Sequence, residues 1–402
     1  MKILNVVGAR PNFIKIAPII EQMNLHPKML IQKLVHTGQH YDDRMSKAFF
    51  DDLGIPKPDI NLEVGSGTHA EQTAHIMMKF EKVCIQERPD LVIVVGDVNS
   101  TLACTITAKK LGIRVAHIEA GLRSKDMTMP EEINRLCTDI LCDYLFTTDH
   151  FANENLAKEG IPAERVFFVG NVMIDALIRH KERAMKLGVM QKLALRREGY
   201  ATLTLHRPSN VDDKFTLRGI FEALQEIAQD IPIIFPIHPR TRKMSEQFGL
   251  QHFFTTDETI RGIRIIEPLG YLEFLHLTMN ARMVLTDSGG LQEETTALGI
   301  PCITLRYNTE RPITCEVGTN VLVGNDRQRI LQAAKDVFQG RVLPRNIPDL
   351  WDGHAAARIV GVLVSLAEKD TGPVYPHLVP RNSRQDSRQN SGSIAYLDKS
   401  TL

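Results

Sequence analysis

Three carboxylates in the first half of the sequence stand at the ends or starts of predicted elements. Asp97 follows residues 94–96, Glu119 follows residues 115–118, and Glu131 opens a segment with helical periodicity. Carboxylates gathered in a partly dry cleft repel one another, which raises at least one pKa toward the range useful for proton transfer at neutral pH. Each could instead cap a helix or form an ion pair. The sequence therefore offers three candidate groups for acid and base chemistry.

A glycine turn in the second half could hold an anion. The turn consists of Ser288, Gly289 and Gly290. It precedes a helical segment over 291–298, and the backbone N–H groups and positive dipole end of a helix start attract phosphate oxygens. Glu293 or Glu294, one turn further on, could accept hydrogen bonds from a ribose diol. The alternative is a glycine turn with an N-capping serine and a solvated acidic first turn.

Basic side chains follow predicted strands in both halves. Arg10 and Lys15 come after the run 3–7, where the G-x-G-x-x-G spacing of a dinucleotide site is missing but either side chain could hold a phosphate. His206 follows residues 202–205 and could stabilise a leaving phosphate or share a proton. A solvated basic turn and a packed, hydrogen-bonded histidine are the alternatives. Without an H-x-x-x-H, H-E-x-x-H or clustered Asp/His pattern, we predict neither a metal nor a cofactor.

The elements that must position these residues alternate between short β-rich runs and helical segments, a pattern typical of βαβ units with a parallel sheet. In the first half we predict strands over 3–7, 30–36, 91–95, 114–118, 144–147 and 167–171. In the second half we predict strands over 200–205, 231–236, 263–266, 283–286, 302–305 and 319–323. Ligands bind at the carboxyl ends of such strands, so two halves facing each other would form a cleft lined by the candidate residues.

The predicted fold class is therefore α/β, with two Rossmann-like domains facing a central cleft. We place the first domain at residues 1–171, with the acid and base candidates, and the second at residues 172–353. A helix over 354–370 has no predicted strand of its own and could pack on the first domain. Residues 371–402 form a polar, low-complexity tail that we predict to be disordered.

Composition excludes several classes of protein. The chain of 402 residues carries 48 Lys and Arg against 48 Asp and Glu, so no global positive field favours nucleic acid and any anion binding must be local. No apolar stretch approaches the ~18 residues of a membrane span, and the first residues do not resemble a signal peptide. The six cysteines form no C-x-x-C, which favours reduced thiols in a cytoplasmic protein.

Several motifs together resemble one family, the UDP-N-acetylglucosamine 2-epimerases. In the family's order they are Gly8-Ala9-Arg10-Pro11, Gly96-Asp97, residues 117–123, Pro130-Glu131-Glu132-Ile133-Asn134-Arg135, Leu205-His206-Arg207, residues 287–294 and Thr309-Glu310-Arg311-Pro312. The resemblance extends from residue 1 to about residue 368. It implies a two-domain fold of the GT-B type and a UDP-sugar as the partner.

The resemblance implies a reversible inversion at C2 of UDP-N-acetylglucosamine, giving UDP-N-acetylmannosamine for cell-surface polysaccharide precursors. In this family UDP is eliminated to give a glycal-like intermediate and is added back after a proton returns to the other face of C2. Developing charge on the diphosphate needs stabilisation, while C2 needs a base on one face and an acid on the other. A homodimer is the family expectation.

Carried over by resemblance, the catalytic candidates are Asp97, Glu119, Glu131 and His206, with the faces of C2 unassigned. The substrate-binding candidates are Arg10, Lys15, Arg135, Tyr271, Phe274, Ser288, Gly289, Gly290, Glu294 and Arg311. Within this set Ser288, Gly289 and Gly290 match the diphosphate loop and Glu294 matches the ribose contact. Tyr271 and Phe274 lie in the segment that frames uracil, although a core position is the alternative for either.

The chain departs from the family's bacterial members at two places, and residues 65–73 and 206–210 resemble the archaeal-type branch. Many bacterial members have glutamate at the position of Asn12 and Gln-His-Arg-Gln where this chain has Gln39-His40-Tyr41-Asp42, a stretch that helps bind an activating UDP-sugar. We therefore do not expect activation by substrate in the bacterial manner. A hydrolysing 2-epimerase, a UDP-sugar glycosyltransferase of the same fold and a nucleotide-sugar sensor remain as alternatives, although a sensor has no need of three carboxylates at a sugar.

Overall fold

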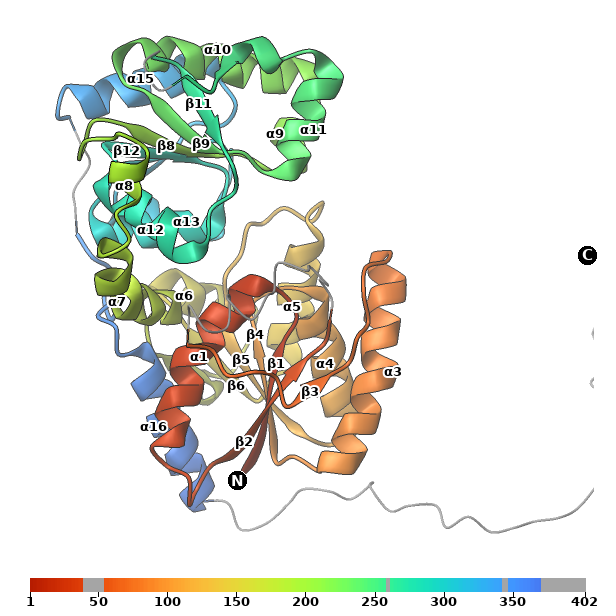
Figure 1. Ribbon diagram of the computed structural model, residues 1–402. Helices are drawn as coiled ribbons and strands as arrows, with labels where there is room; N and C mark the ends of the chain where they lie inside the picture. The colour runs from red at the N-terminus through yellow and green to blue at the C-terminus, as the bar shows by residue number, and fades with distance from the viewer. Residues whose placement is uncertain (39–53, 258–260, 342–345, 370–402) are drawn as a thin grey trace, which may run out of the picture.

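The computed structural model describes residues 1–38, 54–257, 261–341 and 346–369 (Figure 1). The predicted polar tail and the stretch from Gln39 to Asp42 lie outside the described residues. Two parallel sheets, each with helices on its faces, form the two lobes seen in Figure 1. The predicted α/β class with two Rossmann-like halves, the GT-B-type arrangement, is confirmed.

The first sheet has the strand order of a doubly wound fold. Its strands, in spatial order, are β3 (Ile60–Asn61), β2 (Ile31–His36), β1 (Lys2–Val7), β4 (Leu91–Val95), β5 (Arg114–Ala120), β6 (Tyr144–Thr147) and β7 (Val166–Phe168). Its helices are α1 (Arg10–Asn24), α3 (His69–Glu87), α4 (Asn99–Lys110), α5 (Pro130–Leu141) and α6 (His150–Lys158). All residues of β4 are buried, as expected for a central strand of a parallel sheet covered on both faces.

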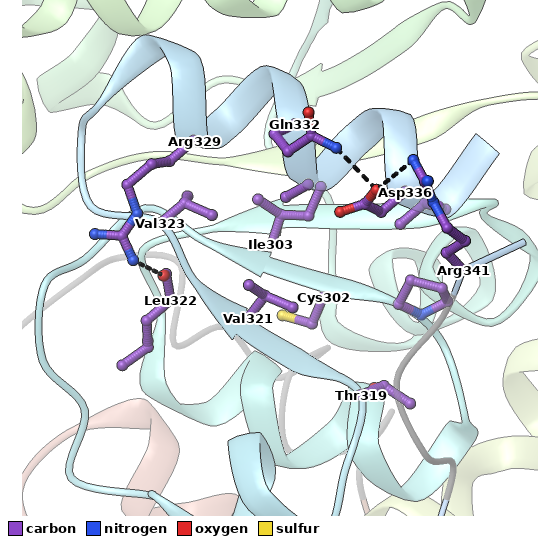
Figure 2. A pocket seen from close by; sticks show the side chains of 13 residues that line it. Cys302, Ile303, Thr319, Val321, Leu322, Val323, Arg329, Gln332, Asp336 and Arg341 are labelled. Atoms are coloured by element: carbon purple, nitrogen blue, oxygen red, sulfur yellow. Dashed lines mark hydrogen bonds and ion pairs between the residues drawn. The ribbon is translucent and has the colours of Figure 1, made fainter. Parts of the chain in front are cut away.

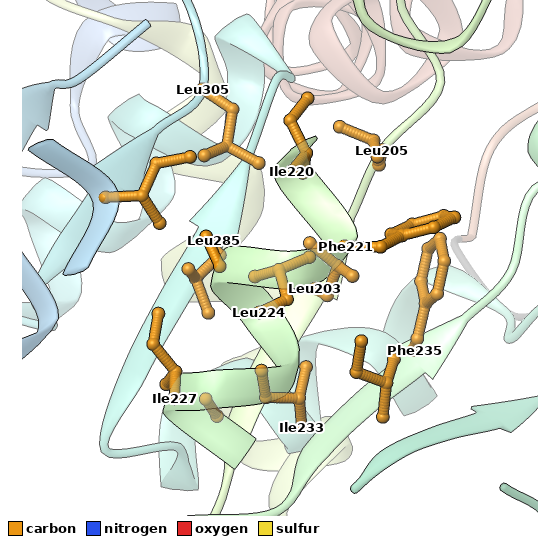
Figure 3. Packing of buried hydrophobic residues seen from close by; sticks show 14 of the residues in the cluster. Leu203, Leu205, Ile220, Phe221, Leu224, Ile227, Ile233, Phe235, Leu285 and Leu305 are labelled. Carbon is orange, nitrogen blue, oxygen red and sulfur yellow. The ribbon is translucent and has the colours of Figure 1, made fainter. Parts of the chain in front are cut away.

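The second sheet is also doubly wound, but its strand order differs at one edge. Its strands, in spatial order, are β10 (Phe254–Thr255), β11 (Ile263–Ile266), β9 (Ile233–Pro236), β8 (Ala201–Thr204), β12 (Met283–Thr286), β13 (Cys302–Thr304) and β14 (Asn320–Leu322). Its helices are α9 (Pro208–Val211), α10 (Lys214–Asp230), α11 (Pro239–Phe248), α12 (Tyr271–Asn280), α13 (Gly289–Leu298), α14 (Ile313–Glu316) and α15 (Arg327–Phe338). Figure 3 shows its core, where Phe221 and Leu224 of α10 lie against side chains of the central strands.

Sequence periodicity located the central strands but missed the two-residue strands β3 and β10, which are too short to show alternation. The strand predicted over 167–171 ends earlier, at Phe168, because the chain turns there into the next helix. Gly170 has φ +86°, and the Asn171 side chain accepts a hydrogen bond from the Met173 amide 2.9 Å away. Asn171 is thus the N-cap of α7 (Val172–Met185), which runs between the two lobes (Figure 1).

The chain returns to the first lobe at its end. After α7 and the short α8 (Val189–Lys192), the second sheet is completed, and α16 (Ala355–Lys369) then lies beside α1 (Figure 1). Ile359 and Leu363 of α16 are fully buried in the same core as Phe13 of α1. The Asp175 carboxylate of α7 accepts from the Ala355 and Ala356 amides and so holds the start of α16. The helix predicted from the sequence over 354–370 therefore packs on the first sheet.

Candidate active site between the two sheets

The candidate residues of each half gather at the carboxyl ends of three neighbouring strands. In the first sheet β1, β4 and β5 are adjacent, and they lead to Arg10, Asp97 and Glu119. In the second sheet β8, β12 and β13 are adjacent, and they lead to His206, to the turn 288–290 and to the segment that contains Arg311. Both sets lie at the point where the strand order reverses, which is where doubly wound sheets bind ligands.

Glu119 occupies a strained position at the end of β5. The pairing of β5 with β6 shifts register between Ile118 and Ala120, and Glu119 in this bulge has φ +69°. A left-handed conformation costs a non-glycine residue about 1–2 kcal/mol, and such strain gathers at functional sites. The carboxylate is buried, and its Oε2 forms an ion pair with Nζ of Lys15, itself only 8% exposed. The structure therefore joins two of the sequence candidates into one buried pair.

Asp97 is held by α5. Its carboxylate, about one-third exposed, pairs with Nη1 of Arg135, while Asn134 donates to the Asp97 carbonyl oxygen at 2.9 Å. The buried Arg135 also donates from Nε and Nη2 to Glu132, at 2.9 and 2.7 Å. Two carboxylates thus share one guanidinium, and the more exposed of the two, Asp97, faces the site.

Glu131 is half-buried in the first turn of α5, and its negative charge affects a residue of the second domain. Burial and the neighbouring Arg306 lower the pKa of Arg207, whereas the negative charges of Glu310, Glu131 and Asp287 act in the opposite direction. Glu131 is therefore close enough to Arg207 to interact with it electrostatically. The two lobes also meet directly, because Asn308 donates to Asp126 at 3.4 Å and Arg135 lies 4.0 Å from Glu310.

His206 is oriented by Asp287. His206 Nδ1 lies 3.0 Å from Asp287 Oδ1, while Asp287 Oδ2 accepts from the backbone amides of His206 and Arg207 at 2.9 and 2.8 Å. Burial alone would raise the pKa of Asp287, but the His206 contact and these amides outweigh it and lower that pKa. A carboxylate that holds Nδ1 leaves Nε2 to face the site, and the His206 side chain is 39% exposed.

The glycine turn lies under Arg311. A Cβ added at Gly289 would stand 2.7 Å from Arg311 Nη1, so a larger residue would displace the guanidinium from its place over the turn. Among the described residues, nothing lies within 4 Å of a Cβ added at Gly290, so that backbone faces open space. Ser288 is the N-cap of α13, but its hydroxyl makes no capping bond within the described helix. The N-terminus of α13 therefore keeps the donors that an anion needs.

Arg311 is surrounded by acids. Its Nε lies 2.9 Å from Oε1 of Glu293, and its Nη1 donates to Glu310 at 3.3 Å. Burial would lower the pKa of Arg311, but the charges of Glu293, Glu310, Glu119 and Asp97 raise it overall. The last two belong to the first lobe, so Arg311 interacts with the candidate carboxylates of both halves.

A raised carboxyl pKa, predicted for the first half, is found in the second. Burial raises the pKa of Glu293, as does the charge of Glu119, against the opposing charge of Arg311. Burial also raises the pKa of Glu294 to about 7, although Tyr271 donates a hydrogen bond to it at 3.1 Å. Tyr271 also packs against the apolar cluster that contains Trp351, and Phe274 packs against the cluster that contains Val284 and Leu291. A uracil contact for either ring stays a prediction.

We expect Glu294 to make the stability of the unliganded protein depend on pH. A carboxyl whose pKa is raised in the folded state stabilises the fold below the unfolded pKa, and this stability is lost as pH rises through about 7. The loss amounts to up to about 3 kcal/mol. Chemical unfolding at several pH values between 5 and 8 should show a smaller fall in unfolding free energy for Glu294→Gln than for wild type. Parallel pH profiles of the two proteins would contradict this.

Several residues of the site were not chosen from the sequence. Asp287, Glu310 and Glu132 all stand inside motifs quoted above, so the signal for them was present but their partners were not visible. Arg306, which donates from Nη2 to Glu310 at 2.7 Å, had no sequence signal. Asn12, noted as a departure, accepts from the Gly8 and Ala9 amides at 3.2 and 3.0 Å and so holds the turn after β1.

Other features of the described chain lie outside this site. A cavity of about 320 Å³ lies between β13, β14 and α15, where Asp336 accepts from Gln332 and pairs with Arg341 (Figure 2). None of the candidate site residues lines it. Among the described residues no group of three His, Cys, Asp or Glu side chains could hold a metal ion. No described helix is long and apolar enough to cross a membrane.

Comparison with known proteins identifies a family. A family model described as UDP-N-acetylglucosamine 2-epimerase matches residues 23–364. The UDP-N-acetylglucosamine 2-epimerase of Methanocaldococcus jannaschii is 45% identical over 368 residues, covering 90% of this chain and 99% of the relative. The corresponding enzyme of Escherichia coli K12 is 33% identical over 90% of this chain and 98% of its own length. The higher identity to the archaeal enzyme agrees with the predicted archaeal-like branch.

Two further comparisons bear on the substrate. The UDP-2,3-diacetamido-2,3-dideoxy-D-glucuronate 2-epimerase of Pseudomonas aeruginosa is 42% identical over 91% of this chain and 100% of its own. A crystal structure of the M. jannaschii 2-epimerase in complex with UDP-GlcNAc and UDP is 45% identical, with a TM-score of 0.81, and covers 91% of this chain and 100% of that one. Similar chains thus act on UDP-sugars that differ in the substituents of the ring.

Proposed function

The chain belongs to the UDP-N-acetylglucosamine 2-epimerase family, and from that premise we propose that it interconverts UDP-N-acetylglucosamine and UDP-N-acetylmannosamine without net hydrolysis. One observation carries the proposal: the carboxylates of the first sheet face the anion-binding groups of the second. Arg311 illustrates this, because it contacts Glu293 and Glu310 of its own half and interacts with Glu119 and Asp97 of the other.

The carboxylates supply the proton chemistry at C2. One of Asp97, Glu119 and Glu131 takes the C2 proton, the C1–C2 double bond forms, and the electron pair of the C1–O bond leaves with UDP. In the return step a second group delivers a proton to the other face of C2, and a β-phosphate oxygen attacks C1. The C2 proton is not acidic by itself, so its loss depends on the departure of UDP. Lys15 pairs with Glu119 and Arg135 pairs with Asp97, and these contacts hold both carboxylates in place.

The second half stabilises the leaving diphosphate. Backbone N–H groups at Gly289 and Gly290, the dipole of α13 and the Arg311 guanidinium supply positive charge where the phosphate oxygens gain negative charge. His206, held through Nδ1 by Asp287, adds a donor or a proton at Nε2. Holding UDP and the intermediate in one closed cleft favours recombination over escape. This retention distinguishes the proposed epimerase from a hydrolysing enzyme.

The test follows hydrogen exchange at C2. The purified protein is incubated with UDP-N-acetylglucosamine in D₂O, and the products are followed by NMR. We expect deuterium at C2 in a mixture of both UDP-sugars. Free UDP with free N-acetylmannosamine would instead indicate a hydrolysing enzyme, and no exchange without an added acceptor would favour a glycosyltransferase. A parallel reaction with a UDP-2,3-diacetamido uronic acid tests the substrate of the P. aeruginosa relative.

The assembly and the cellular role follow from the family resemblance alone. We propose a cytoplasmic homodimer that makes precursors of cell-surface polysaccharides. The exposed face of α5 offers a place to look for a subunit contact, because Ile133 and Ile140 are 44% and 63% exposed and lie about two turns apart on it. Sedimentation equilibrium measures the mass of the assembly directly, and a monomer at micromolar concentration would contradict the proposed dimer.

A further inference from the structure

We propose that His117 and Asp139, two fully buried residues behind the site, position the carboxylates of Asp97 and Glu119 for proton transfer. The assignment to proton transfer rests on the proposed function. Neither residue reaches the cleft, since both are 0% exposed. They act instead on the backbone that carries the two carboxylates, through β5, which contains His117, and α5, which contains Asp139.

His117 ties the end of β4 to this pair. Its Nε2 lies 2.7 Å from the Gly96 carbonyl oxygen, and its Nδ1 lies 2.6 Å from Oδ1 of Asp139. A carbonyl oxygen can only accept, so Nε2 must carry a hydrogen. Gly96 directly precedes Asp97 and has φ +67°, a conformation that glycine adopts freely. The hydrogen bond from His117 therefore fixes the peptide from which the Asp97 side chain projects.

Asp139 holds the turn that follows β5. Its Oδ2 accepts from the Gly121 amide at 3.0 Å and pairs with Arg123 Nη1 at 2.7 Å. Burial would raise the pKa of Asp139, but contact with His117 and Arg123 outweighs it and lowers that pKa. The other carboxylate oxygen, Oδ1, contacts Nδ1 of His117 at 2.6 Å. The carboxylate is thus fully engaged by donors from the strand and from the turn after it.

These contacts bracket Glu119. His117 precedes it by two residues and Gly121 follows it by two, and Asp139 holds both. Glu119 itself sits in the left-handed region at φ +69°, a conformation that persists only where the surroundings impose it. The same helix α5 also carries Asn134 and Arg135, which hold the carbonyl and the carboxylate of Asp97. One buried anion and one imidazole thus set the relative placement of the two carboxylates.

The experiment compares His117→Ala, His117→Gln and Asp139→Asn with a matched control. Asp143→Asn is the control, because Asp143 accepts from the Val115 amide at 2.7 Å and so tethers the opposite end of the same strand β5. We expect kcat for C2 exchange to fall by about 10²-fold in His117→Ala and Asp139→Asn, as for a displacement of about 1 Å. KM and the dissociation constant for UDP should stay within about threefold of the wild-type values. The kcat of the Asp143→Asn control should also stay within about threefold of wild type. His117→Gln, whose amide can still donate to Gly96, should recover part of the loss.

Two outcomes would overturn the proposal. The first is that the His117 and Asp139 variants lose no more kcat for C2 exchange than the control Asp143→Asn does. The other is a rise in the UDP dissociation constant that matches the loss of kcat, which would indicate general unfolding. Crystal structures give a readout that does not need activity: His117→Ala should displace the Asp97 or Glu119 carboxylate relative to α13, and unmoved carboxylates would contradict positioning. If wild type exchanges no UDP-sugar but the carboxylates move, the proposed function fails while positioning stands.

Discussion

Asp97→Asn is expected to lower the rate of C2 hydrogen exchange by about 10³-fold while leaving UDP binding intact. The amide has nearly the shape of the carboxylate but cannot take up a proton as a base. The fold should survive, because Arg135 keeps both of its contacts with Glu132. Exchange of C2 hydrogen is measured by NMR in D₂O, and UDP binding is measured by calorimetry.

The control for this variant changes a residue at the other end of the same strand. Asp90→Asn alters a carboxylate that accepts from the Lys2 amide at 2.6 Å, at the opposite end of β4 from Asp97. It should exchange C2 hydrogen at nearly the wild-type rate. If Asp97→Asn also retained exchange, Asp97 would be removed from the proton-transfer set, leaving Glu119 and Glu131. Testing Glu119→Gln and Glu131→Gln in the same assay would then assign the two faces of C2.

Arg311→Met is expected to destabilise the protein by about 3–5 kcal/mol and to abolish UDP binding. The variant leaves Glu293 buried at 0% exposure, with Asn171 donating to it at 2.9 Å but without its guanidinium partner. It also removes the cation that lies over Gly289 at the start of α13. Urea unfolding measures the loss of stability, and titration with UDP measures the loss of binding.

A double variant separates these two effects. Adding Glu293→Gln to Arg311→Met removes the unpaired buried charge, so part of the stability should return while UDP binding stays absent. The coupling free energy between the two substitutions measures how much of the lost stability came from the unpaired carboxylate of Glu293. Purely additive losses would show that the 2.9 Å contact between Arg311 and Glu293 contributes little to the fold.

The central elements of the fold were predictable because their signals are local. The strand over Leu91 to Val95 is a continuous apolar run, and the helix from Ala355 to Lys369 follows the period of an amphipathic helix, so each needs only its own sequence to be recognised. The edge strands β3 and β10 were missed because two residues cannot show a period. The end of β7 was misplaced because Asn171 serves as an N-cap, a role that depends on the helix it opens.

By itself the sequence determined the α/β class, the family and the set of chemical groups at the strand ends, because these follow from periodicity and from motifs contiguous in the chain. Only the tertiary structure decided which groups act together. The pairs Lys15–Glu119, Arg135–Asp97 and Arg311–Glu293 join residues 18 to 104 positions apart. Such pairs form because parallel strands bring distant segments to one edge, where charges removed from water must find partners. The same burial placed the raised carboxyl pKa at Glu294 in the second half.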